Sequence, residues 1–175
     1  MGKAILISGR PGIGKTTVFT KVIDRIKQHK NVGGIVTKEV RRGGVRVGFQ
    51  VEDITSLRRG WLARRDIAFG PKVGRYHVIL SDFERIGVSA LEKALIDPTV
   101  DIIAVDELGP MEFSSHKFQK AFTKIISSGK DILCTIQLKM LDEIRIKIGA
   151  GSVKTFITTQ KNREDIDKLI LQELE

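Results

Sequence analysis

The sequence has 175 residues, of which 41% are hydrophobic and 29% charged; this suits one compact domain over residues 1–175 and excludes extensive disorder. Thirty Lys and Arg against 21 Asp and Glu give a net charge of +9, which favours anionic partners, nucleic acid among them. A single cysteine, Cys134, excludes an internal disulfide, and no apolar stretch approaches the roughly 18 residues of a membrane span. We therefore expect a cytoplasmic protein that does not insert into a membrane, with Cys134 as a buried thiol.

The N-terminal part of the chain alternates strand, loop and helix. An apolar run, Ala4 to Ile7, predicts a strand, and the pattern from Lys15 to about Lys30 predicts a helix after a glycine-rich turn. The β-branched run Ile35 to Thr37 follows. Glycines then recur among short alternating stretches, which is typical of antiparallel hairpins. We therefore expect an antiparallel hairpin excursion over about residues 39–80, lying on or extending the main sheet.

Regular alternation resumes after the excursion. Apolar strands are predicted at 101–105, 132–136 and 153–157, between helices at 83–96, 117–127, 141–148 and 163–174. Strands without polar alternation are buried on both faces, as in a parallel sheet. The order predicts an α/β fold, a three-layer sandwich with a mostly parallel central sheet.

A phosphate-binding loop is the first motif that carries chemistry. The segment GRPGIGKT at residues 9–16 matches G-x-x-x-x-G-K-[ST] at every fixed position, between a predicted strand and a predicted helix. Glycines let backbone N–H groups curl around a phosphate, while Lys15 reaches the β- and γ-phosphates and the Thr16 hydroxyl binds Mg²⁺. The predicted nucleotide-binding residues of this loop are Gly9, Arg10, Pro11, Gly12, Ile13, Gly14, Lys15, Thr16 and Thr17.

A pair of acids at the end of a strand is the second motif. In the segment VDIIAVDELGPME, apolar residues lead into Asp106 and Glu107, which a parallel strand would place at the ligand-binding edge of the sheet. We expect Asp106 to hold Mg²⁺ and Glu107 to polarise the attacking water, so that Lys15 and Glu107 are the catalytic candidates. Acids also occur at helix starts for structural reasons. The additional glutamate favours a hydrolase over a kinase.

These motifs together resemble the cancer-related, thermophile nucleoside-triphosphatase family, a family with the P-loop NTPase fold. The matching segments cover nearly the whole chain and lie at residues 9–17, 37–49, 73–78, 106–112 and 159–163. The resemblance implies slow, Mg²⁺-dependent hydrolysis of ATP, GTP, CTP and UTP to the diphosphate and phosphate, by a monomer or a weakly associating protein. Leu108 and Pro110 depart mildly from the family pattern and do not touch the expected chemistry.

Charge that develops on the γ-phosphate is often met by an arginine. Six arginines are candidates: Arg41, Arg42, Arg46, Arg64, Arg65 and Arg163. We favour Arg41 or Arg42, because they follow a strand that should end near the phosphate loop. Asn162 follows the last predicted strand and could face the nucleotide base; a role as a turn former is equally consistent with the pattern.

Two other functions fit part of the pattern. A kinase for a nucleotide or nucleic acid would use the same phosphate loop, with the arginine-rich excursion as an acceptor pocket. A nucleotide-gated module could instead use the net charge of +9 to bind RNA or DNA, with steep salt dependence. An ordinary charged surface, with no nucleic-acid partner, also explains the excess of Lys and Arg. The sequence has no dense basic tail that would favour nucleic-acid binding.

Overall fold

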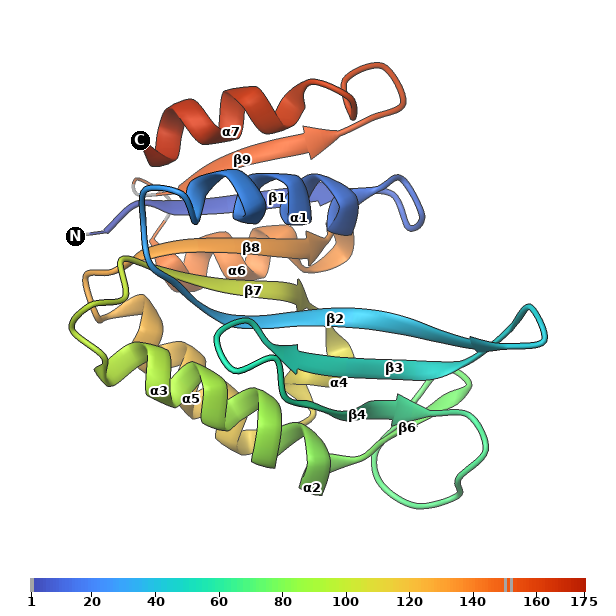
Figure 1. Ribbon diagram of the computed structural model, residues 1–175. Coiled ribbons are helices and arrows are strands. Elements are labelled where there is room, and N and C mark those ends of the chain that lie inside the picture. Colours follow the sequence, from blue (N-terminus) through green and yellow to red (C-terminus); the bar gives the residue numbers. More distant parts are fainter. Residues whose placement is uncertain (1, 150, 152) are drawn as a thin grey trace.

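The computed structural model describes residues 2–149, 151 and 153–175, and its strands form one nine-stranded sheet in the order β5-β6-β4-β3-β2-β7-β8-β1-β9 (Figure 1). The strands are β1 (Ala4–Gly9), β2 (Val32–Arg42), β3 (Val45–Asp53), β4 (Arg59–Arg64), β5 (Lys72–Val73), β6 (Tyr76–Val78), β7 (Ile102–Leu108), β8 (Asp131–Gln137) and β9 (Val153–Thr158). The strand that precedes the phosphate loop, β1, lies inside the sheet between β8 and β9.

The sheet is mixed, so the prediction of a mostly parallel central sheet with an antiparallel excursion is confirmed only in part. Strands β2, β7, β8, β1 and β9 pair in parallel, whereas β3, β4, β6 and β5 extend the sheet from β2 by antiparallel pairing. Short turns connect most of these outer strands, and a short connection can only join antiparallel neighbours. The expected excursion therefore exists, and it continues the main sheet rather than lying on it.

The strand β2 belongs to both halves of the sheet. Its first residues, Val32–Ile35, pair in parallel with β7, while Ile35–Arg42 pair with β3 in an antiparallel hairpin. In Figure 1 this hairpin runs on past the end of β7, so it projects beyond the edge where the parallel strands end. The sequence predicts a short strand at Ile35–Thr37 and an excursion from residue 39; in the structure both belong to the one strand β2.

Helices cover both faces of the sheet. Helices α1 (Lys15–Ile26) and α7 (Ile166–Leu174) lie on one face. The other face carries η1 (a π-helical turn, Phe83–Val88), α3 (Ser89–Ile96), α5 (His116–Ile126) and α6 (Leu141–Ile148). Three short helical turns are also described: α2 (Leu80–Asp82), α4 (Pro110–Phe113) and η2 (Leu138–Met140). None of the described helices is long and apolar enough to cross a membrane.

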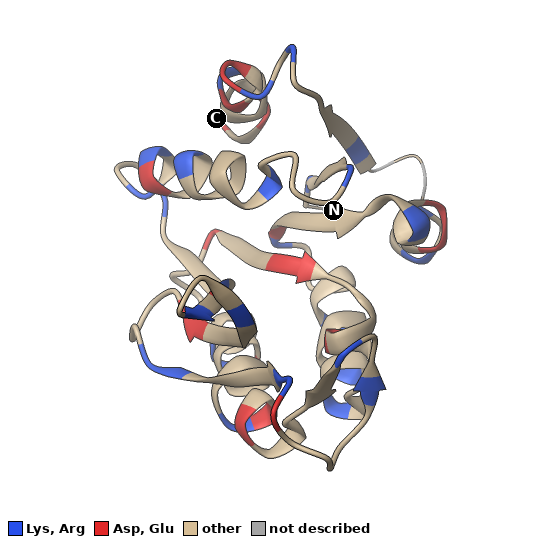
Figure 2. Cartoon of the chain, turned by 90° about the vertical axis from the view of Figure 1, so that its right-hand side faces the viewer, with Lys and Arg blue, Asp and Glu red and all other residues tan. Residues whose placement is uncertain are grey.

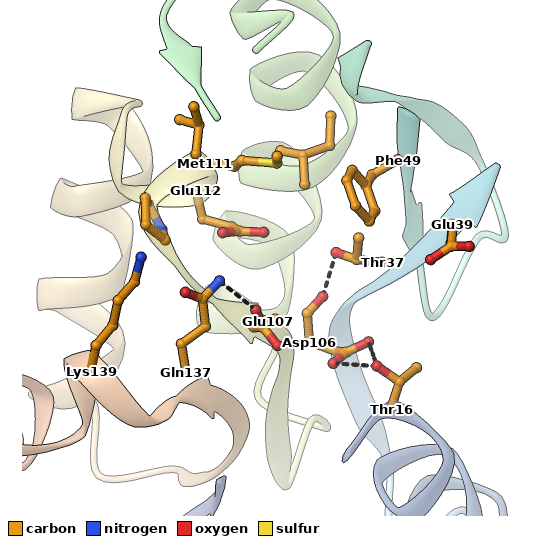
Figure 3. A pocket seen from close by; sticks show the side chains of 13 residues that line it. Thr16, Thr37, Glu39, Phe49, Asp106, Glu107, Met111, Glu112, Gln137 and Lys139 are labelled. Atoms are coloured by element: carbon orange, nitrogen blue, oxygen red, sulfur yellow. Dashed lines mark hydrogen bonds between the residues drawn. The ribbon is translucent and has the colours of Figure 1, made fainter. Parts of the chain in front are cut away.

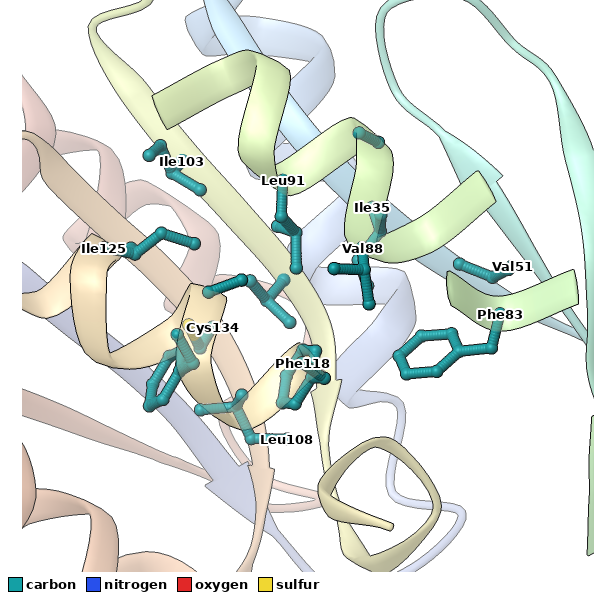
Figure 4. Close-up of a cluster of buried hydrophobic side chains, with 14 of the residues drawn as sticks. Ile35, Val51, Phe83, Val88, Leu91, Ile103, Leu108, Phe118, Ile125 and Cys134 are labelled. Carbon is teal, nitrogen blue, oxygen red and sulfur yellow. The ribbon is translucent and has the colours of Figure 1, made fainter. Parts of the chain in front are cut away.

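Alternation along β1 divides the core between the two faces. Ile5 and Ile7 pack toward α1 and α7, whereas Ala4 and Leu6 join the cluster on the opposite face. Figure 4 shows that opposite cluster, where Phe118 of α5 is fully buried. Both faces of the central strands are therefore dry, which gives the expected three layers of helix, sheet and helix.

One helix start shows how a local polar contact fixes an element next to the site. Ser115 is fully buried, and its hydroxyl oxygen accepts a hydrogen bond from the backbone N–H of Phe118 at the start of α5. The same hydroxyl donates to the Glu84 carboxylate at 2.9 Å. The sequence predicted this helix one residue late and missed α4, which immediately follows β7.

Charged residues are spread over the molecule rather than collected on one face. Figure 2 looks onto the ends of the parallel strands and shows Lys and Arg interleaved with Asp and Glu on helices and strands alike. In the outer strands many cations are paired: Glu52 binds Lys38 and Arg59, and Glu39 binds Arg41 and Arg46. In this view the Lys and Arg residues that give the excess of +9 are therefore not gathered on one helix or strand.

Candidate active site

The site lies at the carboxyl ends of three neighbouring strands. The phosphate loop follows β1, the acid pair ends β7, and β8 lies between them in the sheet. This is the edge at which open α/β sheets bind ligands. The two motifs, about 90 positions apart in the sequence, are thus brought to one edge because β1 and β7 both pair in parallel with β8.

Glycine conformation shapes the phosphate loop. Gly12 and Gly14 have φ angles of 74° and 110°, in the left-handed region that residues with a Cβ rarely adopt. Gly14 ends the turn, and α1 begins at Lys15, so the helix N-terminus points its free N–H groups at the loop. The Lys15 side chain is buried back against the loop, with its Nζ 3.5 Å from the Gly9 carbonyl oxygen.

A cavity of about 420 Å³ opens over the loop. Six of the predicted loop residues line it: Pro11, Gly12, Gly14, Lys15, Thr16 and Thr17. Glu39, Arg46 and Phe49 of the outer strands close its other side, together with Glu107 and Gln137. Gly9, Arg10 and Ile13 are not among the described lining residues; Ile13 instead closes the turn with a backbone hydrogen bond to the Arg10 carbonyl.

Asp106 is held on three sides by threonine hydroxyls. Thr16 Oγ1 lies 3.2 Å from each carboxylate oxygen, and Thr135 of β8 donates to the Oδ1 atom (Figure 3 shows Thr16). Thr37 of β2 donates to the backbone carbonyl of Asp106. Burial, together with the charge of the neighbouring Glu107, raises the pKa of Asp106 to about 6, although the hydrogen bonds from Thr135 and Thr16 act in the opposite direction.

Glu107 connects the acid pair to the phosphate loop. Its Oε2 atom lies 3.7 Å from Lys15 Nζ, and its Oε1 atom accepts a hydrogen bond of 2.9 Å from Gln137 Nε2 (Figure 3). The pairing of β7 with β8 shifts register between Val105 and Leu108, so both acids fall within an irregular stretch of the strand. A regular strand points successive side chains to opposite faces, whereas this break brings both carboxylates to one site.

A second cavity of about 380 Å³ adjoins the first one. Both share Thr16, Glu39, Phe49, Glu107 and Gln137, and the second also reaches Asp106 and Thr37. Its remaining walls are Leu62, Val73, Pro110, Met111, Glu112 and Lys139, several of which appear in Figure 3. The space therefore continues from the phosphate loop, past the acid pair, toward α4.

The structure places the two favoured arginines outside both cavities. Arg41 and Arg42 are exposed and are not among the described residues that line either cavity; Arg41 instead binds Glu39 and the Gly44 carbonyl. Arg46, across the hairpin, lines the cavity over the loop. The reason is the turn of the hairpin: Arg41 and Arg42 lie near its tip, past a shift of register at Val40 and Arg41.

Asn162 forms the turn after β9. Its Oδ1 accepts a hydrogen bond from the Thr159 N–H at 2.7 Å, and its Nδ2 donates to the Ile157 carbonyl at 2.9 Å. Both ends of the amide are therefore used within the loop. Asn162 is not among the described residues that line either cavity. The turn-forming interpretation of this residue accounts for the contacts.

Sequence reasoning missed several residues of the site. Gln137, Thr135 and Thr37 each end or interrupt an apolar strand, and a polar residue in such a position was a signal that could have revealed them. Glu112 and Gly109 lie in the same motif as the acid pair, but their place depends on the short helix α4, which the sequence did not predict.

A protein-family model described as NTPase matches residues 4–171. The chain belongs to the NTPase family. The match covers the phosphate loop, the acid pair and the outer strands together, so the resemblance inferred from the motifs is confirmed.

Relatives of the NTPase family resemble the chain over nearly its full length. The nucleoside-triphosphatase THEP1 of Thermofilum pendens is 38% identical, covering 98% of this chain and 95% of that protein. The nucleoside-triphosphatase THEP1 of Thermotoga petrophila is 43% identical, covering 95% of this chain and 90% of that protein. These names favour triphosphate hydrolysis over the kinase alternative.

Two solved structures of the NTPase family share the fold. The crystal structure of THEP1 from Aquifex aeolicus superposes with a TM-score of 0.83 at 30% identity, covering 98% of this chain and 99% of that one. The solution structure of a human cancer-related nucleoside triphosphatase gives a TM-score of 0.82 at 32% identity, covering 99% and 98%. The mixed α/β architecture is therefore that of the family.

Proposed function

We propose that this member of the NTPase family hydrolyses ATP, GTP, CTP and UTP with Mg²⁺, using Lys15 and Glu107 as its catalytic residues. The observation that carries the proposal is the convergence of two motifs: Thr16 lies 3.2 Å from Asp106, and Lys15 lies 3.7 Å from Glu107. A phosphate bound by the loop would therefore end beside the acid pair.

The residues present fit a magnesium ion. Thr16 offers a hydroxyl oxygen and Asp106 a carboxylate, the hard oxygen ligands that Mg²⁺ prefers. Among the described residues no three His, Cys, Asp or Glu side chains gather as a metal cage, which agrees with an ion held chiefly by one or two protein oxygens and phosphates. When bound, Mg²⁺ supplies charge neutralisation to the β- and γ-phosphate oxygens.

The chain's own groups perform the remaining work. The loop N–H groups and Lys15 bind the phosphate oxygens and stabilise the charge that grows as the bond between the γ-phosphorus and the bridging oxygen breaks. Glu107 orients a water molecule whose oxygen forms the new bond to phosphorus, and accepts the proton that the water loses. Gln137 fixes the Glu107 carboxylate from the other side. The diphosphate leaves with the bonding electron pair.

Broad use of bases follows from where the contacts lie. The groups that converge at this site would face phosphate, metal and water, and Asn162, for which a base contact and a turn were equally consistent with the sequence, uses both ends of its amide in its own turn. A site that recognises mainly the triphosphate discriminates weakly among ATP, GTP, CTP and UTP.

The test measures phosphate release from each of the four triphosphates, with Mg²⁺ and with excess chelator. We expect similar rates on the four substrates, loss with chelator, and loss of at least about 100-fold in Lys15→Ala and Glu107→Gln. Glu143→Gln, an exposed residue on α6, is the matched control for Glu107→Gln. Unchanged hydrolysis in Glu107→Gln would remove the proposed role of this residue in orienting water.

A further inference from the structure

The buried carboxyl group of Glu112 has no role in the scheme above. Glu112 belongs to the short helix α4 and is only 4% exposed, although a carboxyl group buried without compensation is costly. Its side chain forms part of the wall of the second cavity, and in Figure 3 its carboxyl group points into that cavity above Glu107. Backbone N–H groups of Glu112 and Gly109 offset part of this cost, and the remainder calls for a physical reason.

Because Gly109 has no side chain, Glu112 lies close to Glu107 and Gln137, the groups proposed to position the attacking water. A Cβ atom at Gly109 would lie 3.0 Å from Gln137 Nε2, 3.1 Å from Glu112 Oε2 and 3.5 Å from Glu107 Oε1. These three polar groups therefore surround one small space that exists because the residue is glycine. The φ angle of Gly109 is −146°, an extended conformation open to any residue, so space rather than backbone strain explains the glycine here.

The charged groups around this space determine the state of Glu112. Asp106 and Glu107 face the cavity from β7, Glu39 from β2 and Lys139 from η2, and no described side chain pairs with the Glu112 carboxyl group by an ion pair or a hydrogen bond. Lys15 is committed to Glu107, and Arg41 and Arg46 to Glu39. Burial, and then the charges of Glu107 and Asp106, raise the pKa of Glu112 to about 8, against the backbone N–H groups of Glu112 and Gly109, which lower it. This environment favours the neutral acid.

We propose that Glu112 is a positioning residue for hydrolysis: its protonated carboxyl group donates a hydrogen bond, directly or through one water in the space beside Gly109, to the Glu107 carboxylate. Glu107 is then fixed by Gln137 on one oxygen, by Lys15 on the other, and by Glu112 from the side of α4. A carboxylate fixed in this way holds the attacking water in one direction. This inference rests on the proposed function, since it assigns Glu112 a place in that reaction.

The decisive comparison is between two substitutions at one position. Glu112→Gln keeps the shape and a hydrogen-bond donor, so kcat should stay within about threefold of the parent. Glu112→Ala removes the donor, and kcat should fall by about 10- to 100-fold, the worth of one hydrogen bond to a charged group. Because the nucleotide is bound elsewhere, titration with a fluorescent nucleotide should show unchanged affinity in both variants.

Two further measurements separate positioning from mere support of the fold. Gly109→Ala puts a methyl group where Gln137 and Glu112 meet, so kcat should fall while the melting temperature stays near that of the parent. The rate of the parent should also decline as the pH rises past about 8, where Glu112 loses its proton, and this decline should be absent in Glu112→Gln. Glu143→Gln, exposed on α6, serves as the control in each assay.

Each outcome decides the proposal. Full activity in Glu112→Ala, or in a folded Gly109→Ala if Glu112→Ala does not fold, overturns it. If kcat falls equally in Glu112→Gln and Glu112→Ala, the proposal that a neutral hydrogen-bond donor at this position matters is refuted. The proposed function is tested separately. If the parent releases no phosphate in the presence of Mg²⁺, hydrolysis is refuted and the role of Glu112 is refuted with it. If the parent is active and the substitutions of Glu112 do not change kcat, only the positioning role is refuted.

Discussion

The protonation of Glu112 makes a quantitative prediction about the free energy of unfolding. Replacing the carboxyl group by the amide in Glu112→Gln removes a group that the folded protein holds as a neutral acid and that the unfolded chain ionises freely. The pKa of Glu112 is raised from 4.5 to about 8 in the folded protein, chiefly by burial. Between these two values, folding requires the uptake of a proton.

The sign and size of the effect follow from this difference. The folded state binds more protons than the unfolded state, so the free energy of unfolding falls as the pH rises, by about 1.4 kcal/mol for each pH unit between 4.5 and 8. The full loss in the parent approaches about 5 kcal/mol above pH 8, an upper limit because cavity water and neighbouring groups relax. Glu112→Gln does not carry this loss.

Denaturant unfolding of parent and variant at pH 5, 7 and 9 measures the effect. The difference in unfolding free energy should favour Glu112→Gln increasingly with pH, by several kcal/mol at pH 9 relative to pH 5. The control Glu143→Gln, which alters an exposed carboxylate, should show no comparable trend. A difference between Glu112→Gln and the parent that stays constant from pH 5 to pH 9 would refute the reasoning that Glu112 is neutral in the folded protein.

Three further predictions concern the metal, a helix start and the core. Because protonated Asp106 is a poor metal ligand and burial raises its pKa to about 6, calorimetric titration should show weaker binding of Mg²⁺ with nucleotide at pH 5 than at pH 7; the terminal phosphate of the nucleotide takes up a proton in the same range, so the trend should be smaller in Asp106→Asn, and an equal trend would contradict the role of Asp106. Ser115→Ala should lower the free energy of unfolding by about 1–2 kcal/mol, because it removes the cap of α5 and the partner of Glu84; an unchanged denaturation midpoint would contradict this. Phe118→Ala should cost about 3–5 kcal/mol in the same assay, since it empties a fully buried position.

The sequence determined the chemistry of the site more completely than its surroundings. The phosphate loop and the pair Asp106 and Glu107 were found because each motif needs residues at fixed local spacing, and the flanking strands show their apolar pattern within a few positions. That the two motifs converge also followed, because the carboxyl ends of parallel strands share one edge. The thiol of Cys134 is fully buried as expected, and burial raises its pKa well above the usual range.

The rest depended on pairing between distant strands. Nothing within residues 39–80 distinguishes a hairpin that extends a sheet from one that lies on it, so the balance of parallel and antiparallel strands could not be predicted. The same limit hid that Arg46, and not Arg41, lines the cavity over the phosphate loop, because a shift of register lies near the hairpin tip. Glu112 was missed because its burial depends on α4 and on the space beside Gly109. Neither feature leaves a periodic pattern of apolar residues in the sequence.

The shared strand β2 ties the mechanical behaviour of the outer hairpin to the chemistry. The half of β2 next to β7 ends near Thr37, whose hydroxyl holds the Asp106 backbone, and the other half runs on into the hairpin with Glu39 and its arginine partners. Because β2 is one strand, the stem of the hairpin and Thr37, which holds the Asp106 backbone, are parts of the same element, although the register shift at Val40 and Arg41 separates them from the hairpin tip. A displacement of the hairpin stem would therefore reach Asp106, the residue proposed to bind the metal.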